Sequence, residues 1–179
     1  MDNTRREFLK KIATGTTGIL LSTNSLYAAI SENEKRFIHL YNEHTGEEFK
    51  SMYKVNGIYV KKELIRFNYF MRDFRTHEVI NIDPRLLDIL YSLNKKLESE
   101  KPLIVISGYR SPKTNEMLRK NTYGVAKHSY HIIGRAIDIT SEHYSVKKIA
   151  SIARHLRKGG VGQYNHSHFV HIDTGRVRQ

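Results

Sequence analysis

Short apolar or alternating segments recur along the chain and predict strands. They cover residues 36–41, 103–107, 135–140 and 169–173. Residues 42–47 contain a Thr-Gly turn after the first of these strands. Asn56-Gly57 lies between apolar runs within residues 49–60, and this dipeptide is typical of a two-residue hairpin turn. The first part of the pattern therefore predicts antiparallel pairing.

Leucines at near-helical spacing after Asp83-Pro84 predict a helix over residues 84–97. Ser111-Pro112 and Ser145 are cap signals for two further helices, and Gly159-Gly160 is expected to end the second. Residues 61–69 are expected to form a short helix. Interleaved helices and hairpins indicate an α+β domain with a small antiparallel sheet and flanking helices.

The length of 179 residues and a hydrophobic share of 39% suit one folded domain with an appendage. We expect residues 29–83 to form the N-terminal hairpin and helix segment of this domain. Residues 84–179 are expected to form its core.

Residues 1–28 have the layout of a secretory signal. Arg5 and Arg6 precede Phe-Leu-Lys, and residues 12–29 contain no charged side chain. The apolar run is too short for a membrane-spanning helix, so no stable membrane anchor is expected. The alternative is a disordered basic N-terminus, and cleavage is expected after Ala28.

The arginine pair and the weakly apolar run resemble a twin-arginine export signal. This resemblance implies that the folded protein crosses the inner membrane and works in the periplasm.

The charge balance is strongly basic, with 30 Lys and Arg against 18 Asp and Glu and a net charge of +12. A basic protein attracts polyanions such as nucleic acid, anionic lipid or anionic wall polymer. Nucleic acid ranks last among these partners, because the basic residues follow no recognisable binding motif and export removes the usual target. The chain has no cysteine, so His, Asp and Glu must supply any metal ligands.

Seven of the ten histidines fall between His128 and His171. His131 and Asp138 stand on either side of Gly134, which allows a tight turn, so their side chains are expected to converge. Asp138 lies between two isoleucines, where a buried carboxylate needs a cation or donors. The alternative is that strand alternation places Asp138 on an exposed face. Alternation also places His171 and Asp173 on one face of the last strand.

Several motifs resemble the family of D-alanyl-D-alanine peptidases and hedgehog-like zinc domains. Residues 129–138 read SYHIIGRAID and agree with the family signature Ser-x-His-x-x-Gly-x-Ala-x-Asp. Residues 107–111, SGYRS, resemble the arginine loop of that family. Residues 159–162, GGVG, and 169–175, FVHIDTG, resemble the branch represented by murein endopeptidase K. The similarity covers roughly residues 86–178 and is weaker over residues 31–83.

The resemblance implies that His131, Asp138 and His171 bind one Zn²⁺ ion, with water in the fourth position. Three N or O ligands and an open position are typical of catalytic zinc. Arg110 is expected to hold a substrate carboxylate or a developing oxyanion, because its guanidinium stays charged and donates a planar fork. The alternative for Arg110 is an ordinary surface-loop arginine.

The general base is expected to be Asp173, with His168 as the second choice. The wider family often has Glu three residues before the last ligand, and His168 occupies that position here. Asp173 has an alternative role, the orientation of His171. The remaining histidines of the region are expected to be solvent-exposed, namely His128, His143, His155 and His166.

The resemblance implies a zinc metallopeptidase that hydrolyses peptide cross-links of bacterial peptidoglycan, as a D,D- or L,D-endopeptidase. Its expected partners are peptidoglycan stem peptides, and the oligomeric state stays open. The alternative is a catalytically inactive wall-binding zinc module.

Overall fold

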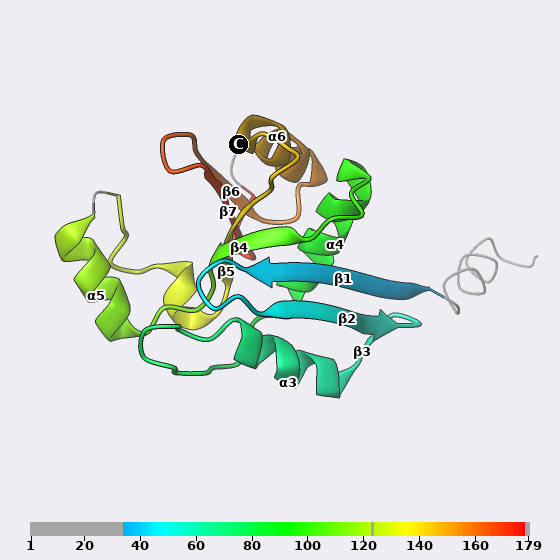
Figure 1. Ribbon diagram of the computed structural model, residues 1–179, viewed down its shortest axis with the longest axis horizontal. Helices are drawn as coiled ribbons and strands as arrows, with labels where there is room; N and C mark the ends of the chain where they lie inside the picture. Colours follow the sequence, from blue (N-terminus) through cyan, green and yellow to red (C-terminus); the bar gives the residue numbers. More distant parts are fainter. Residues whose placement is uncertain (1–33, 123, 178–179) are drawn as a thin grey trace, which may run out of the picture. The chain divides into compact units, whose positions relative to one another are not determined.

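The computed structural model describes residues 34–122 and 124–177. The predicted signal segment, residues 1–28, lies outside the described residues. Glu34 to Gln179 cluster as one compact unit, which contains every helix and strand discussed below (Figure 1).

Seven strands form one sheet in the order β3-β2-β1-β4-β5-β7-β6. Their bounds are β1 Lys35–Asn42, β2 Glu48–Val55, β3 Ile58–Tyr59, β4 Leu103–Ser107, β5 Ala136–Thr140, β6 Gly160–Tyr164 and β7 Phe169–Asp173. Neighbouring strands are antiparallel except β1 and β4, which run parallel. The predicted α+β class is confirmed, and the parallel pair joins the N-terminal hairpin to the rest of the sheet.

The α-helices of the described residues occupy the predicted places. Their bounds are α3 Lys61–Phe70, α4 Arg85–Leu97, α5 Pro112–Asn121, the 3₁₀ helix η1 Tyr130–Ile133, and α6 Val146–Leu156. The sequence pattern predicted neither η1 nor β6. Helix α6 ends before Gly159, because Arg157 at φ 51° is its left-handed cap. Gly159 has another reason to be glycine, since a Cβ there would overlap the carbonyl oxygen of Asp173.

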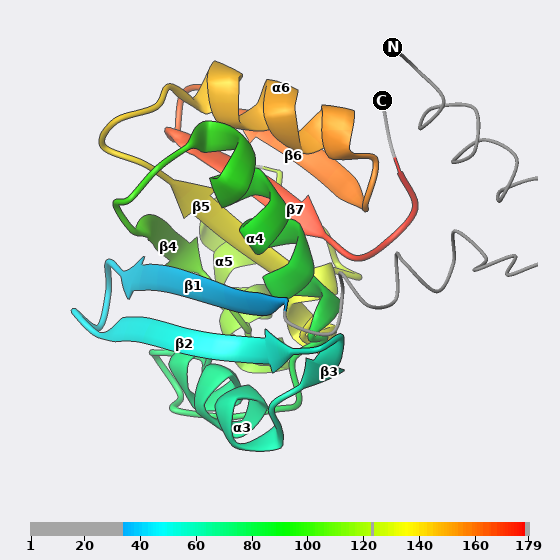
Figure 2. The ribbon, with the colours of Figure 1, turned by 90° about the vertical axis from the view of Figure 1, so that its right-hand side faces the viewer.

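Helices α4 and α6 cover one face of the sheet (Figure 2). The alternating apolar residues of β5 and β7 point to this side and pack with the buried leucines of α4. Because strand side chains alternate, Asp138 of β5 and His171 of β7 point to the opposite face. The sheet thus separates the main hydrophobic core from the polar residues that the sequence singled out.

The hairpin of β2 and β3 closes at the predicted Asn56-Gly57 turn. Asn56 and Gly57 have φ values of 52° and 76°, as a type I′ turn requires. Helix α3 packs on this hairpin through Phe67 and Phe70, whose rings lie 5.4 and 5.5 Å from that of Phe49. Within the described residues, no helix is long and apolar enough to cross a membrane.

Candidate metal centre

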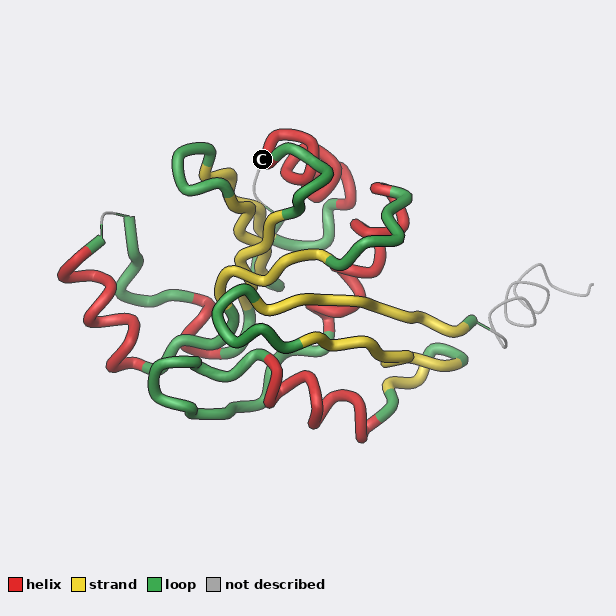
Figure 3. The backbone as a smooth tube through the Cα atoms, in the orientation of Figure 1, coloured by secondary structure: helices red, strands yellow, loops and turns green. Residues whose placement is uncertain are grey.

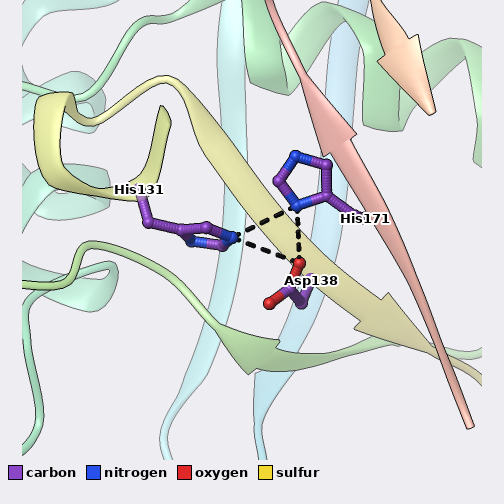
Figure 4. Close-up of side chains that lie close together, drawn as sticks. All are labelled: His131, Asp138 and His171. Atoms are coloured by element: carbon purple, nitrogen blue, oxygen red, sulfur yellow. Dashed lines mark hydrogen bonds and ion pairs between the residues drawn. The ribbon is translucent and has the colours of Figure 1, made fainter. Parts of the chain in front are cut away.

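Three elements that are separate in the sequence bring His131, Asp138 and His171 together (Figure 4). His131 comes from η1, Asp138 from β5 and His171 from β7. Their potential ligand atoms all lie within 4.8 Å of one another. Within residues 34–122 and 124–177, this is the one group of three such residues found close enough to share an ion.

Local structure explains how each side chain reaches the site. The Ser129 hydroxyl accepts a hydrogen bond from the His131 amide at 3.3 Å and caps η1. Gly134, at φ 66°, ends η1 in the left-handed region and turns the chain into β5. Asp138 and His171 are directly opposite each other in the antiparallel β5–β7 pair. Cross-strand register and one tight turn therefore produce the convergence that the sequence predicted.

One carboxylate oxygen of Asp138 faces both histidines. Oδ1 lies 2.8 Å from His171 Nδ1 and 3.2 Å from His131 Nε2, and the two ring nitrogens are 3.2 Å apart. Asp138 is only 2% exposed. The alternative of an exposed face for Asp138 is therefore excluded, and this buried carboxylate requires cationic or donating neighbours.

The outer nitrogens of both histidines have partners of their own. His131 Nδ1 lies 2.6 Å from the carbonyl oxygen of Gly108, which only accepts, so Nδ1 carries the proton and donates it. His171 Nε2 lies 3.2 Å from Asp173 Oδ2 and donates in the same way. Each ring is thereby oriented so that its inner nitrogen can offer a lone pair to a metal ion.

Burial and nearby charges have opposite effects on the pKa values of these residues. Burial acts to raise the pKa of Asp138, but the two histidines and Arg110 outweigh it and hold that pKa below its ordinary value. Burial lowers the pKa of His131. Burial also acts to lower the pKa of His171, but hydrogen bonds to Asp138 and Asp173 prevail and raise it to about 9. Without a metal, His171 is thus the protonated member, and a metal ion would replace that proton.

Arg110 lies directly beside the three residues. Its Nη2 donates to Asp138 Oδ2 at 2.5 Å, and its Nε donates to the Ser107 hydroxyl at 2.8 Å. Its side chain is 15% exposed. The alternative of an ordinary surface-loop arginine is therefore excluded. Ser107 was not singled out by the sequence analysis, although it belongs to the motif that carries Arg110.

The two residues considered for the general base lie in different surroundings. Asp173 is fully buried, and its carboxylate accepts from His171 Nε2 and, at 2.8 Å, from the Gly175 amide. His168 is exposed in the turn between β6 and β7. Neither residue lines the cavity described next. The position of Asp173 behind the His171 ring favours the orienting role for Asp173, and its assignment as the base stays a prediction.

A cavity of about 610 Å³ opens over the three residues. His131, Asp138, His171 and Arg110 all line it, together with aromatic residues from the ends of β6 and β7. His128 also lines this cavity while being exposed, and the other three histidines expected at the surface, His143, His155 and His166, are exposed as well. The site therefore has room for a peptide segment beside the convergent donors.

The donor set fits one zinc ion. Two oriented imidazole nitrogens and one carboxylate oxygen converge, and the side facing the cavity leaves a position for water or substrate. The partners of the outer nitrogens are those typical of zinc-binding histidines.

Comparisons with known proteins agree along nearly the whole chain. A family model described as peptidoglycan L,D-endopeptidase MepK matches residues 30–179. The peptidoglycan L,D-endopeptidase MepK of Escherichia coli (strain K12) is 41% identical over 177 residues, which cover 99% of this chain and 97% of that protein. The probable peptidoglycan L,D-endopeptidase MepK of Haemophilus influenzae is 38% identical over 179 residues, covering 99% and 96%.

Proposed function

We propose that this chain, which belongs to the peptidoglycan L,D-endopeptidase MepK family, hydrolyses L,D-peptide cross-links of peptidoglycan with one zinc ion. His131, Asp138 and His171 would hold that ion. The choice of L,D over D,D bonds rests on the names of the relatives.

One observation carries the zinc part of the proposal. Both histidines present an inner nitrogen to Asp138 Oδ1 while their outer nitrogens are hydrogen-bonded to Gly108 and Asp173. An arrangement that served only to neutralise Asp138 would not require this orientation of both rings. It is the arrangement that points both inner nitrogens at one place, where a cation can bind them once it displaces the proton of His171.

The reaction would combine the metal with groups of the chain. When bound, zinc supplies a Lewis acid for the scissile carbonyl and lowers the pKa of a coordinated water. Arg110 keeps a positive charge next to Asp138, where it can stabilise negative charge that develops on a carbonyl oxygen. Asp173 keeps the His171 ring in one orientation. The cavity walls hold the peptide against these groups.

The experiment that tests this function uses purified protein and defined muropeptide dimers. L,D-linked and D,D-linked dimers are incubated with the protein, with and without a chelator, and the products are identified by mass. We expect cleavage of the L,D bond, its loss with the chelator, and its return on addition of zinc. Cleavage that persists without metal would contradict the zinc assignment. Binding without any cleavage would favour an inactive wall-binding module.

We also propose that the protein is exported to the periplasm by the twin-arginine route. The support is the sequence of residues 1–28, in which Arg5-Arg6 precede a weakly apolar run. Replacing both arginines by lysine should leave unprocessed precursor in the cytoplasm. Normal processing of that variant would contradict the proposed route.

A further inference from the structure

The cavity over the metal centre contains a second arginine that the motifs did not point to. Arg75, in the loop after α3, lines the cavity together with Arg110. Among the described residues that line the cavity, Asp138 is the only acidic one, and it is paired with Arg110. The positive charge of Arg75 therefore has no counterpart among the lining residues.

The Arg75 guanidinium is held by stacking. Its central carbon lies 4.1 Å from the centre of the Phe74 ring, and Phe74 in turn stacks on His44 with 4.1 Å between ring centres. The ion pairs of the described residues include those of Arg72 and Arg110 but none of Arg75. Stacking uses the flat face of a guanidinium and leaves the N–H groups at its edge available to an anion.

Arg75 and Arg110 both lie in loops, a class of segment drawn in green in Figure 3, and hydrogen bonds join the two loops. The buried Asp73 carboxylate accepts from the Arg75 amide at 2.9 Å through one oxygen and from the Ser111 amide at 2.8 Å through the other. The Tyr109 amide donates to the Met71 carbonyl at 2.8 Å. The buried Asp73 carboxylate and one backbone hydrogen bond thus fix the position of the Arg75 loop relative to the Arg110 loop.

Gly108 shows how closely these loops approach. A Cβ at this position would lie 2.7 Å from the Met71 carbonyl oxygen, which is too close for any larger residue without a shift of the backbone. The same glycine supplies the carbonyl that orients His131. Gly108 therefore contacts both the Arg75 loop and His131 of the candidate metal centre.

We infer that Arg75 binds a free carboxylate of the substrate and selects cross-links in which that carboxylate is not amidated. The inference rests on the proposed function. In an L,D cross-link the D-centre supplies the amine of the scissile bond, so its own carboxyl group lies two bonds from the amide nitrogen. A guanidinium pairs with such a carboxylate through two parallel hydrogen bonds, and an uncharged amide loses this interaction. Arg75 is thus a specificity-determining residue.

The test compares two L,D-linked dimers that differ only in a free or an amidated D-centre carboxyl. The proteins are the wild type, Arg75→Gln, Arg75→Lys and Arg72→Gln. Arg72 is the matched control, because it also stacks on an aromatic ring at 4.1 Å but pairs with Glu47 and does not line the cavity.

For the wild type we expect kcat/KM to be about 10- to 100-fold higher for the free carboxylate, as the loss of a charge-assisted hydrogen-bonded pair predicts. Arg75→Gln should lose most of this preference, mainly through a higher KM with kcat little changed. Arg75→Lys should keep part of it, because lysine retains the charge but not the fork. Arg72→Gln should keep the full preference. An Arg75→Gln variant that keeps the full preference, or loses activity equally on both dimers, would overturn the inference.

A binding experiment separates this inference from the proposed function. The same two dimers are titrated calorimetrically into metal-free protein, where no cleavage occurs, and thermal unfolding verifies that each variant is folded. Binding that favours the free carboxylate and depends on Arg75 supports the inference even if no dimer is ever cleaved. Cleavage without such a preference in either assay overturns the inference and leaves the proposed function intact.

Discussion

Two carboxylates, the buried Asp138 and the half-buried Asp88, are surrounded by donors in different parts of the same unit. Asp138 lies on β5 beside two histidines and Arg110. Asp88 lies on α4, where it joins that helix to the N-terminal hairpin. In both cases burial acts to raise the pKa of the carboxyl group, and hydrogen bonds and positive charges outweigh it, so that both pKa values lie below the ordinary range.

The donors around Asp88 leave no place for a metal ion. Oδ1 accepts from Arg36 at 3.0 Å and from the Tyr53 hydroxyl at 2.9 Å. Oδ2 accepts from Lys54 at 2.8 Å and from the Tyr59 hydroxyl at 2.6 Å. The arginine and the lysine are cations themselves, so each carboxylate oxygen is already satisfied by permanent proton donors.

The donors around Asp138 differ in kind and in orientation. Oδ2 is paired with Arg110, but Oδ1 faces two imidazole nitrogens whose protonation can change. A cavity opens on this side, whereas Asp88 is enclosed between a helix and a hairpin. A carboxylate can take part in holding a metal ion when its neighbours offer oriented lone pairs and an open position. Where the neighbours are permanent proton donors, as around Asp88, the carboxylate joins structural elements instead.

The sharpest test exchanges Asp for Asn at each of the two positions. Asp138→Asn should remove most of the bound zinc and lower kcat/KM by at least about 10³-fold, since losing even one electrostatic stabiliser costs about 10²–10³-fold. Metal analysis and dimer cleavage are the measurements. Asp88→Asn is the control and should retain about one equivalent of zinc with nearly normal turnover. Full zinc content in Asp138→Asn would show that Asp138, like Asp88, is not needed to hold the metal.

Asp173→Asn tests whether the residue behind His171 orients it or accepts the proton. If Asp173 orients His171, its replacement by Asn should lower zinc affinity by about 10–100-fold, and turnover should return at saturating zinc. If Asp173 is the base, the same replacement should lower kcat by about 10²–10⁴-fold while zinc stays bound. Zinc titration and kcat measured on the same samples separate the two roles.

His168→Ala is the companion variant. A large loss of kcat in His168→Ala, together with nearly normal turnover in Asp173→Asn, would assign the base to His168. Because His168 is exposed in a turn, its replacement should leave stability almost unchanged.

Asp88→Asn should affect stability more than function. Asparagine keeps the size of the side chain but leaves Lys54 and Arg36 without their shared partner, which we expect to cost about 1–3 kcal/mol in the free energy of unfolding. Urea unfolding followed by circular dichroism measures the change. Tyr59→Phe removes one donor and should cost less. An unchanged free energy of unfolding in Asp88→Asn would show that the cluster does not join the hairpin to α4 energetically.

The smallest expected effect is the pH dependence of that stability difference. The folded pKa of Asp88 is below its unfolded value of about 3.9. Its contribution is therefore fully present above the unfolded pKa and is lost as the pH falls through the folded pKa. The difference between wild type and Asp88→Asn should be constant from pH 7 to 5 and shrink steadily below pH 4. A difference that grows on acidification would contradict the sign of the shift.

Local signals in the sequence were sufficient for most of the secondary structure. Asn56-Gly57 forms the predicted hairpin turn, because few other residues adopt positive φ at both positions. Ser111 and Ser145 cap α5 and α6 by accepting from the third residue after each cap. Strand β6 was missed, because its two glycines and polar residues show no alternating pattern and its pairing with β7 supplies the order.

Residue types and their spacing also indicate which side chains could meet at the site. The order of His131, Gly134, Asp138 and His171 encodes a tight turn that leads into one strand and a second strand later in the chain, with polar residues on one face of both strands. This prediction rests on local chemistry and strand alternation, which can be read from the sequence.

Contacts between segments that are distant in the chain fix which atoms face one another. The sequence left Asp173 with two roles, whereas the structure places its carboxylate on the outer nitrogen of His171. Arg110 had a surface alternative, and the structure pairs it with Asp138. Arg75 carried no motif, and it reaches the cavity because Asp73 fastens its loop to Ser111. The physical reason is common to all three: side-chain orientation depends on packing between segments that are distant in the chain, and no local pattern contains that information.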